Sequence, residues 1–132
     1  MKKLNKYNTG ASLVNKKNNL MYIRTIDIAH PPLNSENAEM VLDDEVRQIR
    51  SAQNLRVLKV IHGHGTDDRP AILKQVVHNW AHNNRMRLLA VIPGEDYNIL
   101  DPKTQEMRKQ CGQVPDLDLG KSNIGITLIW IK

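Results

Sequence analysis

Two histidines and two glycines stand in one short run, His62-Gly63-His64-Gly65, directly after a segment rich in branched aliphatic residues. Imidazole titrates near neutral pH, so a histidine can take up or release a proton during a reaction. Glycine leaves the backbone uncovered, so the N–H groups of Gly63 and Gly65 can approach an anion, above all where a helix begins. A phosphate group is the ligand that such a turn predicts.

His30 is the second histidine to consider, because it follows one predicted strand while His62 ends the next one. If the two strands are parallel and close together, both imidazoles emerge at the same edge of the sheet, where ligands bind in α/β proteins. They could then act as general base and general acid. The alternative is that each is a hydrogen-bonded structural residue and that Gly-x-Gly marks only a tight turn, which is the commoner case.

The elements that must position these residues follow from the apolar patterns. Strands are predicted over residues 22–28, 57–62, 88–92 and 125–131, and helices over 34–53, 68–83 and 102–110. The expected helix caps are Asn34 or Ser35, Asp68 with Pro70 in the first turn, and Asp101. Alternating strands and helices imply right-handed crossovers. We expect an α/β fold, a two-layer sandwich with a four-stranded, mostly parallel sheet in the order strand–helix–strand–helix–strand–strand.

The chain of 132 residues suits one domain, and its charge is unevenly distributed. The net charge is +5, yet the first 24 residues hold six of the 19 basic residues and none of the 14 acidic ones. We expect residues 1–21 to be a flexible basic arm and residues 22–132 to be the domain, with a long irregular segment at 93–124. The arm either adds sequence-independent affinity for phosphates or only solubilises the protein.

The sequence also bears on where in the cell the protein is expected and on its oligomeric state. No apolar run reaches the ~20 residues of a membrane span, and no apolar stretch follows Met1-Lys2-Lys3 as in a signal peptide. The single cysteine, Cys111, excludes an internal disulfide. We expect a cytoplasmic protein without membrane contact, and a monomer.

Three segments in the same order carry a resemblance to a known family. They are the turn Val60–Gly65, the following segment from Ala71 to Trp80, and the last strand with its continuation, Gly125–Lys132. Together they resemble the Smr (small MutS-related) domain family, of the stand-alone bacterial type, over about residues 23–132. The first family motif is displaced here, because His30 stands three residues after Asp27 instead of two and is followed by proline instead of glycine. In a regular strand this shift would point His30 to the opposite face.

The resemblance implies a nucleic-acid-binding protein that nicks DNA or RNA as an endonuclease. Gly63, His64 and Gly65 would then bind phosphate, His62 would transfer a proton or anchor the turn, Asp27 would orient His62, and His30 would be its partner. RNA carries its own 2′-OH nucleophile, whereas DNA needs an activated water and usually a cation such as Mg²⁺. Only Asp67 and Asp68 stand near enough in the sequence to help bind one. The alternatives are a non-catalytic module that docks nucleic acid or protein on the same edge, and a small-molecule phosphate enzyme with a closed pocket.

Other polar residues are interpreted as structural. His78 and His82 are four apart and could share a metal, but a solvated helix face is the commoner reason for this spacing. Arg85 and Arg87 could touch a nucleic-acid backbone, but they precede the third strand and so lie at the edge opposite the histidines. The acidic run 43–45 is interpreted as exposed helix surface, and Cys111 as inert.

Overall fold

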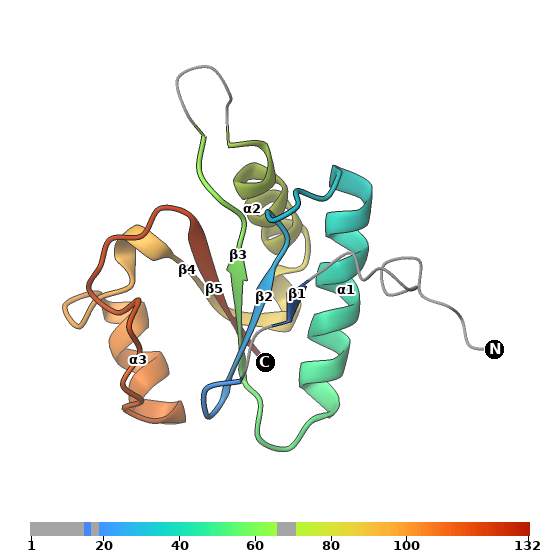
Figure 1. The fold of residues 1–132 in the computed structure, drawn as a ribbon. Helices are drawn as coiled ribbons and strands as arrows, with labels where there is room; N and C mark the ends of the chain where they lie inside the picture. Colours follow the sequence, from blue (N-terminus) through green and yellow to red (C-terminus); the bar gives the residue numbers. More distant parts are fainter. Residues whose placement is uncertain (1–14, 17–18, 66–70) are drawn as a thin grey trace.

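The computed structural model describes residues 15–16, 19–65 and 71–132, and it confirms the α/β class. The strands are β1 (Asn15–Lys16), β2 (Ile23–Asp27), β3 (Val57–Ile61), β4 (Leu88–Pro93) and β5 (Ile126–Ile131). The helices are α1 (Ser35–Ser51), α2 (Ile72–Asn83) and α3 (Pro102–Cys111), with short 3-10 turns at Arg85–Arg87 and Gly94–Asp96. Helices α1 and α2 cover one face of the sheet, and α3 with its neighbouring loops covers the other (Figure 1).

The strand order is β1-β2-β3-β5-β4, which corrects the mostly parallel sheet that the sequence predicted. β2 and β3 pair in parallel, but β5 lies between β3 and β4 and is antiparallel to both. β2, β3 and β4 therefore do point in one direction, as predicted, while the sheet is mixed. All six residues of β5 are buried, which suits a central position, whereas β4 is buried only at Leu88 and Ile92 and lies at an edge.

The helix ends agree with the predicted caps at two of three positions. Asn34 Oδ1 accepts from Asn37 N at 2.8 Å to begin α1, and Asp101 Oδ2 accepts from Thr104 N at 2.9 Å to begin α3. Helix α2 begins at Ile72, later than predicted, and the proposed cap Asp68 with Pro70 lies outside the described residues.

The N-terminal segment is described only in part. Asn15 and Lys16 pair with Asp27 and Ile26 to form the short edge strand β1, while residues 1–14 and 17–18 lie outside the described residues. The flexible basic arm therefore stays a prediction. Within the described residues, no helix combines the length and apolar character needed to cross a bilayer.

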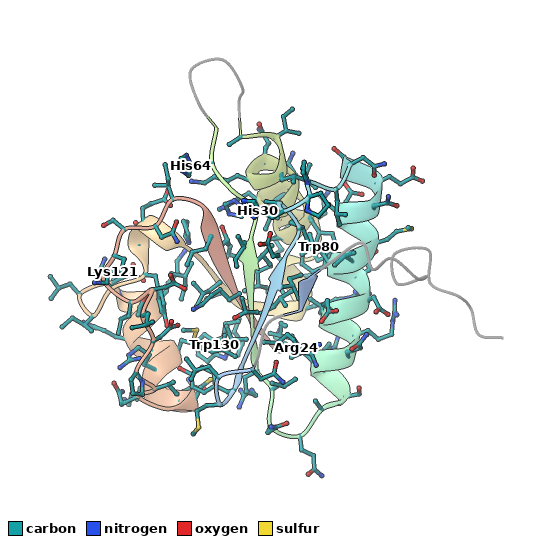
Figure 2. The ribbon with its side chains drawn as sticks, in the orientation of Figure 1. Arg24, His30, His64, Trp80, Lys121 and Trp130 are labelled. Carbon is teal, nitrogen blue, oxygen red and sulfur yellow. The ribbon has the colours of Figure 1, made fainter. Side chains whose placement is uncertain are left out.

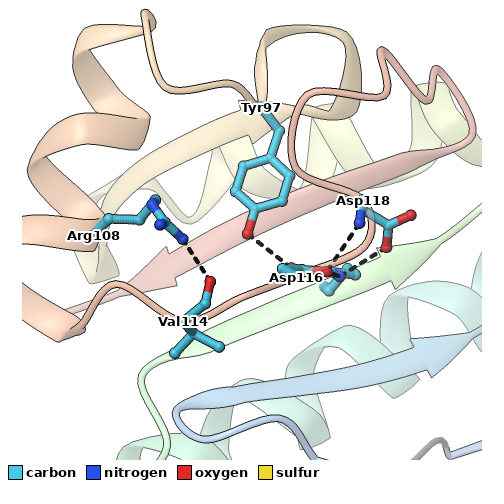
Figure 3. Close-up of polar contacts among 6 residues, drawn as sticks. Tyr97, Arg108, Val114, Asp116 and Asp118 are labelled. Atoms are coloured by element: carbon cyan, nitrogen blue, oxygen red, sulfur yellow. Dashed lines mark hydrogen bonds and ion pairs between the residues drawn. The ribbon is translucent and has the colours of Figure 1, made fainter.

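A buried cluster of charged residues holds the irregular segment onto the sheet (Figure 3). Lys59, in the middle of β3, donates to both oxygens of Asp116 at 2.7 and 2.8 Å and to Asp118 at 2.8 Å. The Tyr97 hydroxyl donates to Asp116 at 2.7 Å, so burial and the adjacent carboxylate raise the pKa of Tyr97. Burial alone would raise the pKa of Asp116, but hydrogen bonds from Lys59 and Tyr97 lower it. Nearby, the Arg108 guanidinium donates to Val114 O at 2.7 Å.

The acidic run on α1 is not simply exposed surface, so that prediction was wrong for Glu45. Glu45 is fully buried and accepts from the Arg24 guanidinium on β2 at 2.7 Å. Asp43 accepts from Trp80 Nε1 of α2 at 2.8 Å. These two contacts tie α1 to the sheet and to α2.

Candidate functional site

The carboxyl ends of β2 and β3 lie side by side. Asp27 is opposite Ile61 in the parallel register, and Ile28 N donates to Ile61 O at 3.0 Å just past the strand ends. A Cβ added to Gly63 would lie 3.6 Å from the Cβ of Ala29, so the turns that follow the two strands are in contact. The two turns that carry His30 and His62 therefore meet at one edge of the sheet, as predicted.

A groove of about 690 Å³ opens at this edge, within the usual size range of ligand sites. It is lined by the β2–α1 turn, the turn after β3 and the first residues of α2: Ala29, Pro32, Leu33, Asn34, Ser35, His62, Gly63, His64, Ala71, Ile72 and Leu73. Its walls are largely aliphatic. Asn34 and Ser35 place the N-terminus of the 17-residue helix α1 at one side, where the helix dipole favours a negative charge.

Asp27 and His30 form a close pair beside the groove. His30 Nδ1 lies 3.0 and 2.9 Å from the two carboxylate oxygens of Asp27, so its N–H donates to the carboxylate. The side chain of Asp27 is only 7% exposed, whereas that of His30 is 70% exposed. His30 does not line the groove itself, but it directly follows Ala29, which does. A buried carboxylate thus holds an imidazole that faces solvent.

The local turn explains how the displaced histidine reaches Asp27. Ile26 and Ile28 face the α1/α2 core, so Asp27 points to the other side of the sheet. Its Oδ1 then accepts from the backbone N–H groups of Ala29 at 2.8 Å and His30 at 3.1 Å. This side-chain-to-backbone turn folds the chain back on itself. Asp27 therefore holds His30 and not His62, which corrects the predicted pairing.

His62 is buried, with an exposed fraction of 4%, and is linked to two other elements. Its Nδ1–H donates to Gly63 O at 2.7 Å, and its Nε2 accepts from the Thr127 hydroxyl of β5 at 2.8 Å. His78 of α2 donates through Nε2 to the same hydroxyl oxygen at 3.0 Å. Burial is the main cause that lowers the pKa of His62 to about 4, so this ring is neutral near pH 7. Of the two predicted roles, this geometry supports the anchor.

The turn predicted to bind phosphate offers fewer backbone donors than expected. Gly63 has a φ of 73°, a conformation that favours glycine, but its N–H donates to Gly125 O at 3.0 Å. His64 is exposed, with Nδ1 3.1 Å from Gly65 O. Helix α2 begins only at Ile72, so the glycines do not form its first turn. Phosphate binding at Gly63, His64 and Gly65 stays a prediction. Of these three residues, His64 is best placed to contact a phosphate, because its imidazole is exposed.

Comparison with protein families gives one match. The model of the Smr domain matches residues 31–89, which span α1, β3, the His62–Gly65 turn, α2 and the start of β4. Over these residues the chain is similar to the Smr domain family. No match to the chain was found among curated proteins, and none among solved structures. The matched part of the chain includes the turn after β3 but begins just after His30, so the Asp27–His30 pair and β5 lie outside it.

The other candidate residues have structural surroundings. His78 faces Thr127 while His82 is exposed, so these two do not act as a pair. Among the described residues, no three His, Cys, Asp or Glu side chains are grouped as a metal site would require. Asp67 and Asp68 lie outside the described part. Cys111 is a free thiol whose pKa is raised by burial, which agrees with an inert residue.

The roles of two residues were missed from the sequence. Thr127 lies in the last strand, which carries part of the resemblance, but nothing in the sequence indicated that its hydroxyl links His62 and His78. Lys59 did carry a signal, because a lysine in the middle of an apolar strand that is expected to be buried requires a carboxylate within reach. The acidic residues of the irregular segment were the candidates.

The low pKa of His62 makes the stability of the domain depend on pH. The folded pKa of about 4 lies below the unfolded value of 6.5, so the unfolded chain binds the proton first as the pH falls. We expect His62 to lower the free energy of unfolding by about 3 kcal/mol between pH 7 and pH 4. Urea unfolding of wild type and His62→Gln at both pH values would measure this. An equal loss in both proteins would contradict a neutral buried His62.

Proposed function

We propose that this domain binds nucleic acid and cleaves its phosphodiester bonds at the carboxyl edge of β2 and β3, with His30 as general base. The observation that carries the proposal is the pairing of an exposed imidazole with a buried carboxylate, His30 with Asp27, next to a groove. The contact of Nδ1–H with Asp27 puts the basic lone pair on Nε2. The buried carboxylate also stabilises the imidazolium that forms when Nε2 takes a proton.

His64 is the second group that we assign to the reaction. It is exposed and stands on the turn after β3, and Figure 2 shows it at the same end of the sheet as His30. An imidazole there can contact a phosphate oxygen or protonate a leaving oxygen. His62 cannot serve this purpose at neutral pH, because its two nitrogens are occupied by Gly63 O and Thr127 and its pKa is about 4.

RNA is the substrate that this site favours. In RNA the 2′-OH gives its proton to His30, the oxygen forms a bond to the adjacent phosphorus, and the P–O5′ bond breaks. The 5′-oxygen takes a proton from an acid such as His64, and a 2′,3′-cyclic phosphate remains. One general base and one acid are enough for this step. Cleavage of DNA needs an activated water instead, for which a divalent cation such as Mg²⁺ is the usual means.

A docking module without catalysis is the second candidate function. The aliphatic lining of the groove supports this function. Pro32, Leu33 and Ile72 offer apolar contact surface but no group that could transfer a proton or attack a phosphate. Such a module would use the same edge and bind nucleic acid without cutting it.

A cleavage assay separates these candidates. Wild-type protein is incubated with end-labelled structured RNA and with supercoiled DNA, each with Mg²⁺ or with EDTA, while binding is followed by fluorescence anisotropy. The His30→Gln variant, purified in the same way, is the control for contaminating nuclease. We expect wild type to cut RNA to products with a 2′,3′-cyclic phosphate. Binding without cleavage in all conditions would favour the docking module, and failure to bind either nucleic acid would overturn the proposal.

A further inference from the structure

A second groove, of about 410 Å³, lies where the C-terminal half of α1 meets the end of α2. It is lined by Asp43, Val46, Arg47, Arg50, Asn84 and Arg87. Asp43, Arg47 and Arg50 are spaced four and three residues apart and so share one face of α1. Arg87 belongs to the 3-10 turn that follows α2. Three guanidinium groups from two segments therefore border one groove, with a single carboxylate among its lining residues.

The positive charge of this arginine groove is only partly balanced by its surroundings. Asp43 is engaged with Trp80 Nε1, and Arg47 pairs with Asp44 at 2.9 Å on the exposed surface, where such a pair contributes little. Among the described residues, Arg50 and Arg87 have no side-chain hydrogen bond or ion pair. Both are exposed. Two guanidinium groups thus stand at the groove with their donors available to a ligand.

The negative end of the α2 dipole does not cancel this charge. Asn84 Nδ2 donates to Trp80 O at 2.8 Å, and its backbone N–H donates to the same oxygen at 3.0 Å and to Ala81 O at 3.2 Å. Arg85 donates to His82 O at 2.8 Å. The last carbonyl groups of α2 are therefore capped, and the groove keeps its affinity for an anion.

From this arrangement we infer that the arginine groove is a second nucleic-acid contact, which binds the phosphodiester backbone away from the cleavage site. Planar guanidinium groups with free donors match phosphate oxygens in two-point contacts. The inference rests on the proposed function, because it assigns a further part of the same nucleic acid to a different surface. Arg87 lies too far from the histidine edge to act there, but in the arginine groove it would bind the phosphate backbone.

The two contacts are separated by most of the length of α1. Ser35 lines the first groove and Arg50 the second, and fifteen residues of helix correspond to about 22 Å. A nucleic acid that touches both must therefore extend over at least about six base pairs at ~3.4 Å each. Glu36 and Glu39, exposed on α1 between them, make a continuous track of phosphates along that helix unfavourable. The ligand would cross from one contact to the other without following α1.

The test uses the full chain and two variants of equal net charge. Arg50→Gln/Arg87→Gln removes both arginines of the groove that lack an acidic partner among the described residues. The matched control, Lys109→Gln/Lys121→Gln, removes two exposed charges from α3 and the loop on the other face of the sheet, where Figure 2 labels Lys121. Fluorescence anisotropy gives the affinity of each protein for a labelled 20-base-pair RNA duplex and for a labelled three-nucleotide RNA at several salt concentrations.

We expect the arginine variant to bind the duplex more weakly and the slope of log K against log salt to fall by about two, one for each lost phosphate contact. Binding of the three-nucleotide RNA should not change, because it is too short to reach both contacts. The control should keep the wild-type slope. If wild type binds the duplex and the arginine variant keeps the wild-type slope, the inference is overturned while the proposed function stands. If wild type binds neither RNA, both are overturned.

Discussion

The His30→Gln variant is expected to cleave RNA about 10²–10⁴-fold more slowly than wild type, the usual contribution of a positioned general base. Glutamine keeps a polar side chain but cannot take up the proton. His30 is largely exposed, so the fold and the binding of nucleic acid should be preserved. Single-turnover cleavage at saturating enzyme measures this, because it separates the chemical step from binding.

Two further variants make that result specific. Asp27→Asn keeps an oxygen for the backbone N–H groups of Ala29 and His30 but loses the negative charge that stabilises the imidazolium, so a loss of similar order is expected. His82→Gln, at an exposed histidine of α2, should cleave as fast as wild type. Unchanged cleavage by His30→Gln would remove His30 from the mechanism.

The Lys59→Met variant is expected to lower the free energy of unfolding by about 3–5 kcal/mol, the usual result of removing one partner from a buried ion pair. Methionine fills a similar volume, but it leaves the carboxylate of Asp116 buried, and among the described residues the Tyr97 hydroxyl and the Asp118 backbone N–H are then its remaining donors. Urea unfolding, followed by circular dichroism at neutral pH, measures the change.

Asp118→Asn is the matched control for Lys59→Met. Asp118 contacts the same ammonium group at 2.8 Å, but its side chain is 34% exposed, so water compensates for much of the lost charge. We expect a loss of at most about 1 kcal/mol. Equal losses in the two variants would mean that the cluster is not organised around a buried Lys59–Asp116 pair.

Local signals in the sequence predicted most of the elements. The cap oxygens of Asn34 and Asp101 mark the starts of α1 and α3, and the apolar segments at 57–62 and 125–131 mark β3 and β5. These features depend on neighbours within a few residues, so a pattern along the chain is enough to find them. The same holds for the edge at which His30 and His62 appear, which follows from two parallel strands.

The details that distinguish the two histidines depend on contacts between distant residues. Burial lowers the pKa of His62 and so keeps its ring neutral, and Thr127 holds the ring by a hydrogen bond. Thr127 is 65 residues away in the sequence, so no pattern of residue spacing could predict this contact. His30 contacts Asp27 because the chain turns directly after β2. The hydrogen bonds of that turn cannot be predicted from the apolar pattern of the strand. The place of β5 between β3 and β4 could not be predicted either, because the order of elements is compatible with several sheet topologies.

The central position of β5 also bears on how the protein is made. β5 is the last of the described strands to leave the ribosome, yet it supplies hydrogen bonds to both β3 and β4. Until residues 126–131 emerge, β3 and β4 each present an open edge to other chains, and the hydroxyl of Thr127 is not yet there to fix His62. The nascent chain therefore completes its sheet and the turn that borders its groove in one final step.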